Sequence, residues 1–216
     1  MAPSRLNQGE PKEIMKIGPK YKIARRLGAP IFEKTQTPKY ALSLARKEKN
    51  ATRGRTKPKS EFGRELIEKQ KSRFSYGLSE RQFRGYVDKA LRSSKPAQTL
   101  FASLESRLDN VLFRSGISKT RAQARQAASH GHVMVNGKRV TIPSIQLSEG
   151  DTVGLRAGSA NSPLFGDATE RMKTITAPAW LKVEPESRQA SVSGEPVYVP
   201  QEHVFDLGVV IEFYNR

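Results

Sequence analysis

Apolar residues recur with helical spacing in the middle of the chain. They lie at positions 104, 108, 111 and 112, which places them on one stripe of an amphipathic helix: Leu104, Leu108, Val111 and Leu112. Gly116 suits the end of this helix, because glycine readily adopts the left-handed conformation that closes a helix. Arg107 and Arg114 lie beside the stripe, so a single helix carries both guanidinium groups on one ridge.

A second helix is predicted to begin after Thr120. Thr120 and Gln123 have the spacing of a capping box, in which each side chain bonds a free backbone N–H of the first turn. Three alanines form a small-residue face for close packing: Ala124, Ala127 and Ala128. Arg121 and Arg125, four residues apart, then point two fixed positive groups away from that face.

A β-hairpin is predicted directly after the second helix. Asn136 and Gly137 both accept positive φ, so this pair is the strongest short signal of a two-residue hairpin turn. Apolar residues alternate on either side of the turn: Val133, Val135, Val140 and Ile142. Lys138 and Arg139 follow the turn and add positive charge to it.

Two further helices are predicted before this region, from Glu61 to about Ser75 and from Ser79 to about Ser93. The second has a core stripe with Tyr86 at its edge: Phe83, Val87, Ala90 and Leu91. Its opposite face carries Arg84 and Asp88 at a spacing of four, which fits either an ordinary ion pair or an RNA contact.

The C-terminal third is predicted to contain strands and one short helix. A strand is expected over 152–155, a linker over 157–166 and a short helix over 167–174. Prolines bracket Val197–Val199, so this segment is predicted as an edge strand. Gly208–Tyr214 alternates apolar side chains and is predicted as a further strand.

The net charge indicates an anionic partner. The chain has 216 residues, a formal charge of +17 and a pI near 10.3, and nucleic acid is the first candidate for its partner. Residues 1–60 hold 16 basic and 4 acidic side chains and few consecutive apolar ones. We therefore expect a basic arm, poorly ordered alone, that either serves as a solubilising tail or folds against RNA.

Composition excludes several other kinds of site. There is no cysteine, which excludes disulfides, thiolate zinc sites and cysteine nucleophiles. His130, His132 and His203 are the only histidines, and no acidic ligands lie near the first two in sequence, so neither metal nor cofactor is expected. No apolar run of about 18 residues predicts a membrane span, and no secretory signal is evident, so we expect an intracellular protein.

Several motifs together resemble a known family. The runs RLDNVLF (107–113), TRAQARQAASHG (120–131) and VMVNGK (133–138) resemble the S-four-type RNA-binding domain. The runs GPKYKIARR (18–26) and YGLSERQFRGY (76–86) resemble, more narrowly, the S-four family of small-subunit ribosomal proteins. Members with an N-terminal metal-binding cysteine cluster differ from this chain, which has no cysteine.

The resemblance implies an α+β fold. It implies a basic N-terminal arm (1–60), a mainly helical body (61–103), an inserted S-four-type domain of two helices and a small antiparallel sheet (104–160), and a C-terminal segment (167–216) that packs with the body and adds a small β element. It also implies a structural protein that binds small-subunit ribosomal RNA, nucleates subunit assembly and influences translational accuracy. The implied partners are that RNA and ribosomal proteins S-five and S-twelve, in the cytoplasm or in an organelle, with no small-molecule substrate and no membrane.

The candidate RNA-binding residues are those whose charge or polarity fits phosphate contacts in this setting. They are Lys20, Lys22, Arg25, Arg26, Arg53, Arg55, Lys57, Lys59, Arg73, Arg84, Arg107, Arg114, Thr120, Arg121, Arg125, His130, Lys138 and Arg139.

Two alternative functions stay open. Pseudouridine synthases often join the same RNA-binding domain to a catalytic aspartate in an Arg-Leu-Asp motif, which occurs here at Arg107-Leu108-Asp109. Here, however, Asp109 lies inside the predicted RNA-binding helix, and no separate catalytic domain remains, so we expect an ion pair and no catalytic residue. The other alternative is a free RNA chaperone or a factor for stalled ribosomes.

Overall fold

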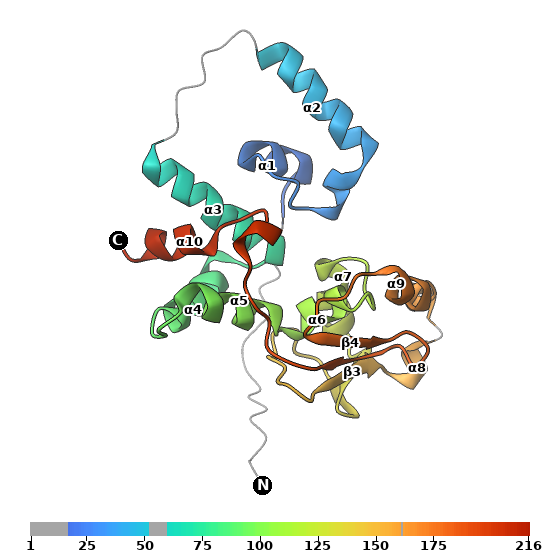
Figure 1. Ribbon diagram of the computed structural model, residues 1–216. Coiled ribbons are helices and arrows are strands. Elements are labelled where there is room, and N and C mark those ends of the chain that lie inside the picture. Colours follow the sequence, from blue (N-terminus) through green and yellow to red (C-terminus); the bar gives the residue numbers. More distant parts are fainter. Residues whose placement is uncertain (1–16, 52–59, 161) are drawn as a thin grey trace.

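The computed structural model describes residues 17–51, 60–160 and 162–216 (Figure 1). Its helices are α1 (Lys20–Leu27), α2 (Pro38–Ala51), α3 (Glu61–Tyr76), α4 (Glu80–Ala90), α5 (Pro96–Glu105), α6 (Leu108–Arg114), α7 (Arg121–Ser129), α8 (Ala157–Ala160), α9 (Ala168–Thr174) and α10 (Leu207–Tyr214), with short 3-10 turns η1 (Glu33–Gln36), η2 (Pro163–Phe165) and η3 (Pro200–Glu202). Its strands are β1 (Val133–Val135), β2 (Lys138–Val140), β3 (Thr152–Leu155), β4 (Leu181–Glu184) and β5 (Gln189–Val192). The predicted α+β class is confirmed.

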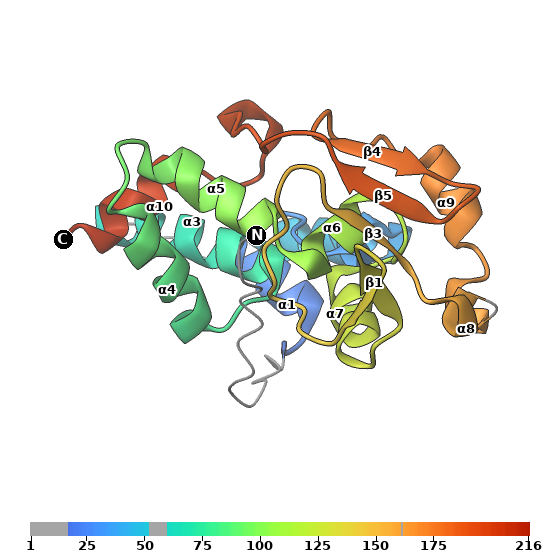
Figure 2. The same cartoon turned by 90° about the horizontal axis from the view of Figure 1, so that it is seen from below.

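Helices α3, α4, α5 and α10 form the helical body, on one side of the molecule in Figure 2. Ser79 and Gln82 form a capping box at the start of α4, because the Ser79 hydroxyl accepts from the Gln82 N–H and the Gln82 side chain accepts from the Ser79 N–H. The predicted stripe of α4 faces the core, where Phe83 and Val87 are fully buried against Leu100 of α5.

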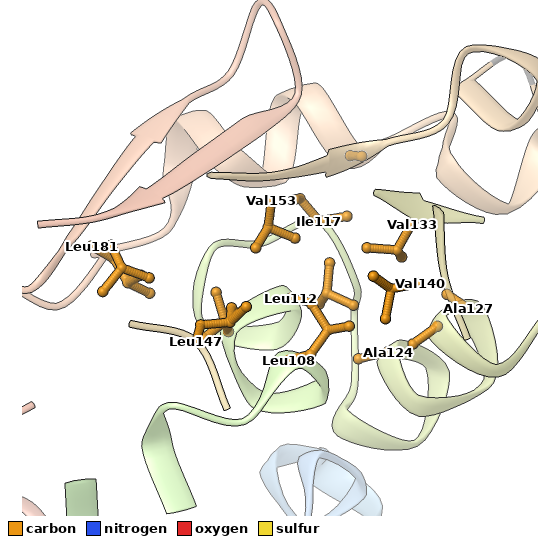
Figure 3. Packing of buried hydrophobic residues seen from close by; sticks show 14 of the residues in the cluster. Leu108, Leu112, Ile117, Ala124, Ala127, Val133, Val140, Leu147, Val153 and Leu181 are labelled. Carbon is orange, nitrogen blue, oxygen red and sulfur yellow. The ribbon is translucent and has the colours of Figure 1, made fainter. Parts of the chain in front are cut away.

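Helices α6 and α7 pack against a five-stranded antiparallel sheet with strand order β2-β1-β3-β5-β4. The labelled side chains of Figure 3 meet between the two layers, and Ala124 and Ala127 of α7 lie among them. The predicted hairpin is confirmed: Asn136 and Gly137 have φ of 48° and 73°, and Val133 pairs with Val140.

The single helix predicted through residues 104–114 is wrong. Arg107 has an extended backbone (φ −65°, ψ 139°) and separates α5 from α6. It forms a β-bridge with Gln146, and the next N–H, of Leu108, donates to the Ile145 carbonyl. The pairing with this loop breaks the helix, so Leu104 lies in the core of the helical body, whereas Leu108 lies in the other core.

The C-terminal segment 167–216 divides between the two cores, whereas the sequence placed all of it on the helical body. β5 pairs with β3, so β4 and β5 extend the sheet of the inserted domain, and α9 packs there too through Met172. Only the last part, with α10, joins the helical body. The predicted linker 157–166 contains α8 and η2 and includes the fully buried Phe165.

The strand predicted at Gly208–Tyr214 is wrong, because the segment forms α10. Asp206 caps the helix by accepting from the Gly208 N–H, and Leu207 and Val210 face the body with helical spacing. Val197–Val199 forms no strand either: the Tyr198 N–H bonds the side chain of Gln98 instead of a neighbouring strand.

The N-terminal segment that the structure describes is folded. Residues 17–51 form α1, η1 and α2 around a small core of Ala24, Phe32 and Tyr40. This core reaches the helical body, since the Phe32 ring lies edge-on to Phe74 of α3 at 6.4 Å. Residues 17–51 are thus ordered in contact with the helical body, and the expectation that the arm is poorly ordered alone stays a prediction.

Candidate nucleic-acid interface

A cleft of about 380 Å³ lies where the N-terminal helices meet α7 and the end of α3. One wall is apolar and includes Ile31, Phe32 and Phe74. Residues of α7, from its first turn to its end, form another part of the lining. Five of the residues predicted to bind RNA line this one cleft: Lys20, Thr120, Arg121, Arg125 and His130.

Arg121 is held rigidly at the base of α7. Its Nε donates to Asn110 Oδ1 at 2.7 Å, and its guanidinium lies 5.1 Å from the centre of the Tyr76 ring and 4.4 Å from that of Phe113. Burial and the nearby charge of Arg114 lower the pKa of Arg121. The bond to a neutral amide leaves this positive charge without a carboxylate bonded to it among the described residues.

Thr120 begins α7 largely as predicted. Its hydroxyl accepts from the Gln123 N–H at 3.1 Å. The Gln123 side chain accepts from the Lys119 N–H instead of completing the box with Thr120. The cap still fixes the first turn of α7, and with it the position of Arg121 in the cleft.

Arg125 and Arg107 converge on one buried carboxylate, Asp109, which is 2% exposed. Arg107 donates to both oxygens of Asp109, at 3.0 and 2.8 Å, and Arg125 Nε donates to Oδ2 at 2.9 Å. Arg125 also donates to the carbonyls of Gly77 and Tyr76 at the end of α3. This ion-pair network ties α6 and α7 to the helical body.

Glu105 is the centre of a second buried network. Arg114 donates to both of its carboxylate oxygens at 2.8 and 2.9 Å, the Tyr76 hydroxyl donates at 2.7 Å and the Asn110 amide at 2.9 Å. Burial opposes ionisation of Glu105, but the charge and hydrogen bonds of Arg114 outweigh it and lower the pKa to about 2. Burial of the Tyr76 hydroxyl and the negative charge of Glu105 beside it raise the pKa of Tyr76.

These networks correct the predicted ridge of outward-facing arginines. Arg107 is 3% exposed, and its guanidinium also bonds the Tyr86 hydroxyl at 2.6 Å, so it is a core residue and not a surface cation. Arg114 is half-buried on Glu105. The break between α5 and α6 turns the Arg107 side chain inward. In the single helix that the sequence predicted, this side chain would have stayed on the same outer ridge as Arg114.

The hairpin presents its cations to solvent. Lys138 and Arg139 are both exposed, and Arg139 Nη2 donates to the His130 carbonyl at 3.4 Å, at the C-terminal end of α7. A cation is favourable there because the last carbonyls of a helix carry partial negative charge. Since His130 also lines the cleft, this bond places Arg139 of the hairpin next to the cleft.

Replacing Gly131 with alanine is expected to displace Arg139. Gly131 has φ +73°, and a Cβ there meets the Arg139 guanidinium, so the variant suffers both backbone strain and a clash. We expect a loss of about 1–2 kcal/mol in the free energy of unfolding, measured with urea. Gly137→Ala is the matched control, because Gly137 has the same φ with nothing near its Cβ. Gly131→Ala is expected to lose more stability and more RNA affinity than Gly137→Ala. Equal losses in the two variants would show that the observed position of Arg139 beside Gly131 contributes to neither property.

The other predicted RNA-binding residues lie in varied settings. Lys22 and Arg26 of α1 are exposed, and Arg25 donates to the Tyr21 carbonyl. Arg73 bonds Gln70 and stacks on Phe74. Arg84 is exposed, 3.9 Å from Asp88, which fits the weak ion pair expected at this spacing. The remaining four lie outside the described residues: Arg53, Arg55, Lys57 and Lys59.

Sequence reasoning missed Glu105 and the apolar wall of the cleft. A signal for Glu105 existed: it is the only carboxylate in the largely apolar run of residues 96–108. Phe32 was missed because the N-terminal region was interpreted from its charge alone. Its apolar neighbours Ile17, Tyr21 and Ala24 have helical spacing, which was the available signal.

Asp109 is 2% exposed and arginines bond both of its oxygens, so it is an internal ion-pair residue and does not face a substrate-sized opening. Within the described ranges no group of three or more histidine, cysteine or acidic side chains is placed to hold a metal ion. Across the same residues, none of the helices is both long and apolar enough to span a membrane.

Comparison with known proteins identifies relatives over most of the chain. Residues 106–153 match the family model for the S4 domain, and residues 15–105 match that for the ribosomal protein S4/S9 N-terminal domain. A protein of Latilactobacillus sakei is 38% identical over 92% of this chain and 98% of its own length, and one of Roseiflexus castenholzii is 39% identical over 93% and 98%. One of Corynebacterium kroppenstedtii is 42% identical over 77% and 83%. Each is named small ribosomal subunit protein uS4.

Proposed function

Because the chain belongs to the small ribosomal subunit protein uS4 family, we propose that it is a structural component of the small ribosomal subunit and binds small-subunit ribosomal RNA directly. The contact surface is the cleft beside α7 together with the β1–β2 hairpin. Arg121, His130 and Arg139 are the central residues of this surface.

The observation that carries this proposal is the separation of the cations into two sets. Arg107, Arg114 and Arg125 have carboxylate partners inside the protein. Arg121, Lys138 and Arg139 have none among the described residues; Arg121 lines the cleft, and Arg139 donates to the carbonyl of His130, which also lines it. Cations with no carboxylate bonded to them, in a chain of +17 charge, fit the phosphates of folded RNA.

The physical mechanism is electrostatic and geometric. Each phosphate that a lysine or arginine neutralises releases condensed counterions, which supplies affinity that weakens as salt rises. The networks around Glu105 and Asp109 hold α6 and α7 against the body, so the basic surface keeps one shape. A fixed shape reduces the entropy lost on binding and selects RNA by its backbone geometry.

The finer parts of the proposal rest on family membership. They are early nucleation of subunit assembly, an influence on translational accuracy, contacts with ribosomal proteins S-five and S-twelve, and location on the ribosome. An enzymatic role of the pseudouridine synthase type has no support, since the relatives are named as ribosomal proteins and Asp109 is occupied by two arginines.

The proposal is tested by the salt dependence of binding to small-subunit ribosomal RNA. Lys138→Gln/Arg139→Gln is expected to lower the slope of log affinity against log salt by between one and two, because two phosphate contacts are lost. The control is Lys173→Gln/Lys182→Gln, which removes the same charge from exposed sites away from the cleft and hairpin. Equal slopes for the two variants, or failure of the wild type to sediment with small subunits, would contradict the proposal.

A further inference from the structure

Arg121 stands out among the cations of the cleft because it is fixed before any ligand arrives. Its guanidinium lies over two aromatic rings and donates through Nε to Asn110, and only Nε has a hydrogen-bond partner among the described residues. Arg121 lines the cleft together with Thr120, at the first turn of α7, and the dipole of this helix favours an anion there. A guanidinium held this way binds a phosphate without first losing side-chain freedom.

The dimensions of the cleft exclude a double helix. A volume of about 380 Å³ is enough for one nucleotide and far too small for a double helix to enter. Ile31, Phe32 and Phe74 add apolar side chains to the lining, with Lys20 5.5 Å from the centre of the Phe32 ring and the Arg73 guanidinium 4.3 Å from that of Phe74. Aromatic rings and guanidinium planes both offer a stacking surface to an unpaired base.

Glu33 gives the cleft a feature that a simple phosphate site lacks. It is the only carboxylate on the cleft wall in the described part of the chain, and it is half-exposed with no ion-pair partner there. A carboxylate repels phosphate but accepts a hydrogen bond from an amino group on a base, as glutamate does with cytosine.

We propose that the cleft holds one unpaired nucleotide, with its phosphate on Arg121, its base against the apolar wall and the base amino group on Glu33. This inference rests on the proposed function, and it adds that the bound RNA places an extruded base here. Bases with an amino group, such as cytosine, fit this arrangement better than uracil. A free nucleotide also has a phosphate, a base and a base amino group, so the experiment distinguishes an extruded base of RNA from a free nucleotide.

Binding of three RNA hairpins to the full chain tests the inference: one fully paired, one with a single bulged cytosine and one with a bulged uracil. The bulged cytosine is expected to raise affinity about tenfold over the paired hairpin, the usual size of one base stacking in a protein site. Ala122→Glu, at an exposed position on the cleft wall, is expected to remove this gain. Ala157→Glu adds the same charge at an exposed position outside the cleft and is expected to retain it. Glu33→Gln is expected to abolish the preference for cytosine over uracil.

Equal affinity of the paired and bulged hairpins would overturn the inference, and so would an equal loss of the bulge preference in Ala122→Glu and Ala157→Glu. Cytidine 5′-monophosphate is expected to compete with the bulge only at millimolar concentration, and competition in the micromolar range would assign the cleft to a free nucleotide. If ribosomal RNA binds with the expected salt slope but the bulge preference is absent, this inference fails alone. If ribosomal RNA does not bind at all, the proposed function fails first.

Discussion

Replacing Glu105 with glutamine is expected to lower the free energy of unfolding by about 3–5 kcal/mol, the usual cost of removing one partner of a buried ion pair. Glutamine has nearly the same volume, so the loss comes from charge and not from a cavity. Arg114 then has no carboxylate to bond, and the hydroxyl of Tyr76 loses a charged acceptor. Urea denaturation followed by circular dichroism measures the effect.

The control for Glu105 is Asp88→Asn, which neutralises a carboxylate in an exposed pair. Because Arg84 and Asp88 are 3.9 Å apart in solvent, a change of less than about 0.5 kcal/mol is expected. A similar loss in both variants would show that the Glu105 network contributes no more than a surface pair.

Acid should affect the same network. The pKa of Glu105 is about 2 in the folded protein and 4.5 when unperturbed. The folded state therefore holds the ionised carboxylate more strongly than the unfolded chain does, and ionisation of Glu105 stabilises the fold. This contribution is complete above about pH 4.5 and is lost as the pH falls from there toward 2. The stability of Glu105→Gln is therefore expected to depend less on pH in this window than that of the wild type.

Asp109→Asn is expected to have the second large effect, again about 3–5 kcal/mol. Asparagine retains one acceptor oxygen, but Arg107 and Arg125 then lie together without the negative charge that both bond. Since Arg125 also bonds carbonyls at the end of α3, the attachment of α7 to the helical body is expected to loosen. Faster hydrogen exchange at Tyr76 and Gly77 would report this loosening.

Asp109→Asn also distinguishes a catalytic role of Asp109 from a structural one. If Asp109 were catalytic, the variant would stay folded and lose an RNA modification. A destabilised variant with no change in any modified nucleotide supports the structural role, whereas wild-type stability would contradict it.

Local signals in the sequence predicted much of the inserted domain. The Asn136-Gly137 turn, the Thr120 cap and the alanine face of α7 each depend on a few neighbouring residues, and each forms as predicted or nearly so. The cleft residues Arg121 and His130 followed from the same local pattern and the family resemblance.

Features that depend on distant partners were not predictable in this way. The break before α6 exists because Arg107 pairs with Gln146, thirty-nine residues later. The alternation at Gly208–Tyr214 indicated a strand, but its apolar residues are also spaced for a helix, and packing on α3 decides between the two. Likewise, the pairing of Arg107, Arg114 and Arg125 with buried carboxylates requires contacts that no local pattern contains.

Competition for incorporation into reconstituted small subunits tests the central claim most directly. A variant with Lys22, Arg26, Lys138 and Arg139 all changed to glutamine removes four exposed charges and leaves both buried networks intact. We expect it to unfold at the same urea concentration as the wild type but to be excluded from subunits by wild-type protein as salt is raised. Incorporation equal to that of the wild type at every salt concentration would contradict the account.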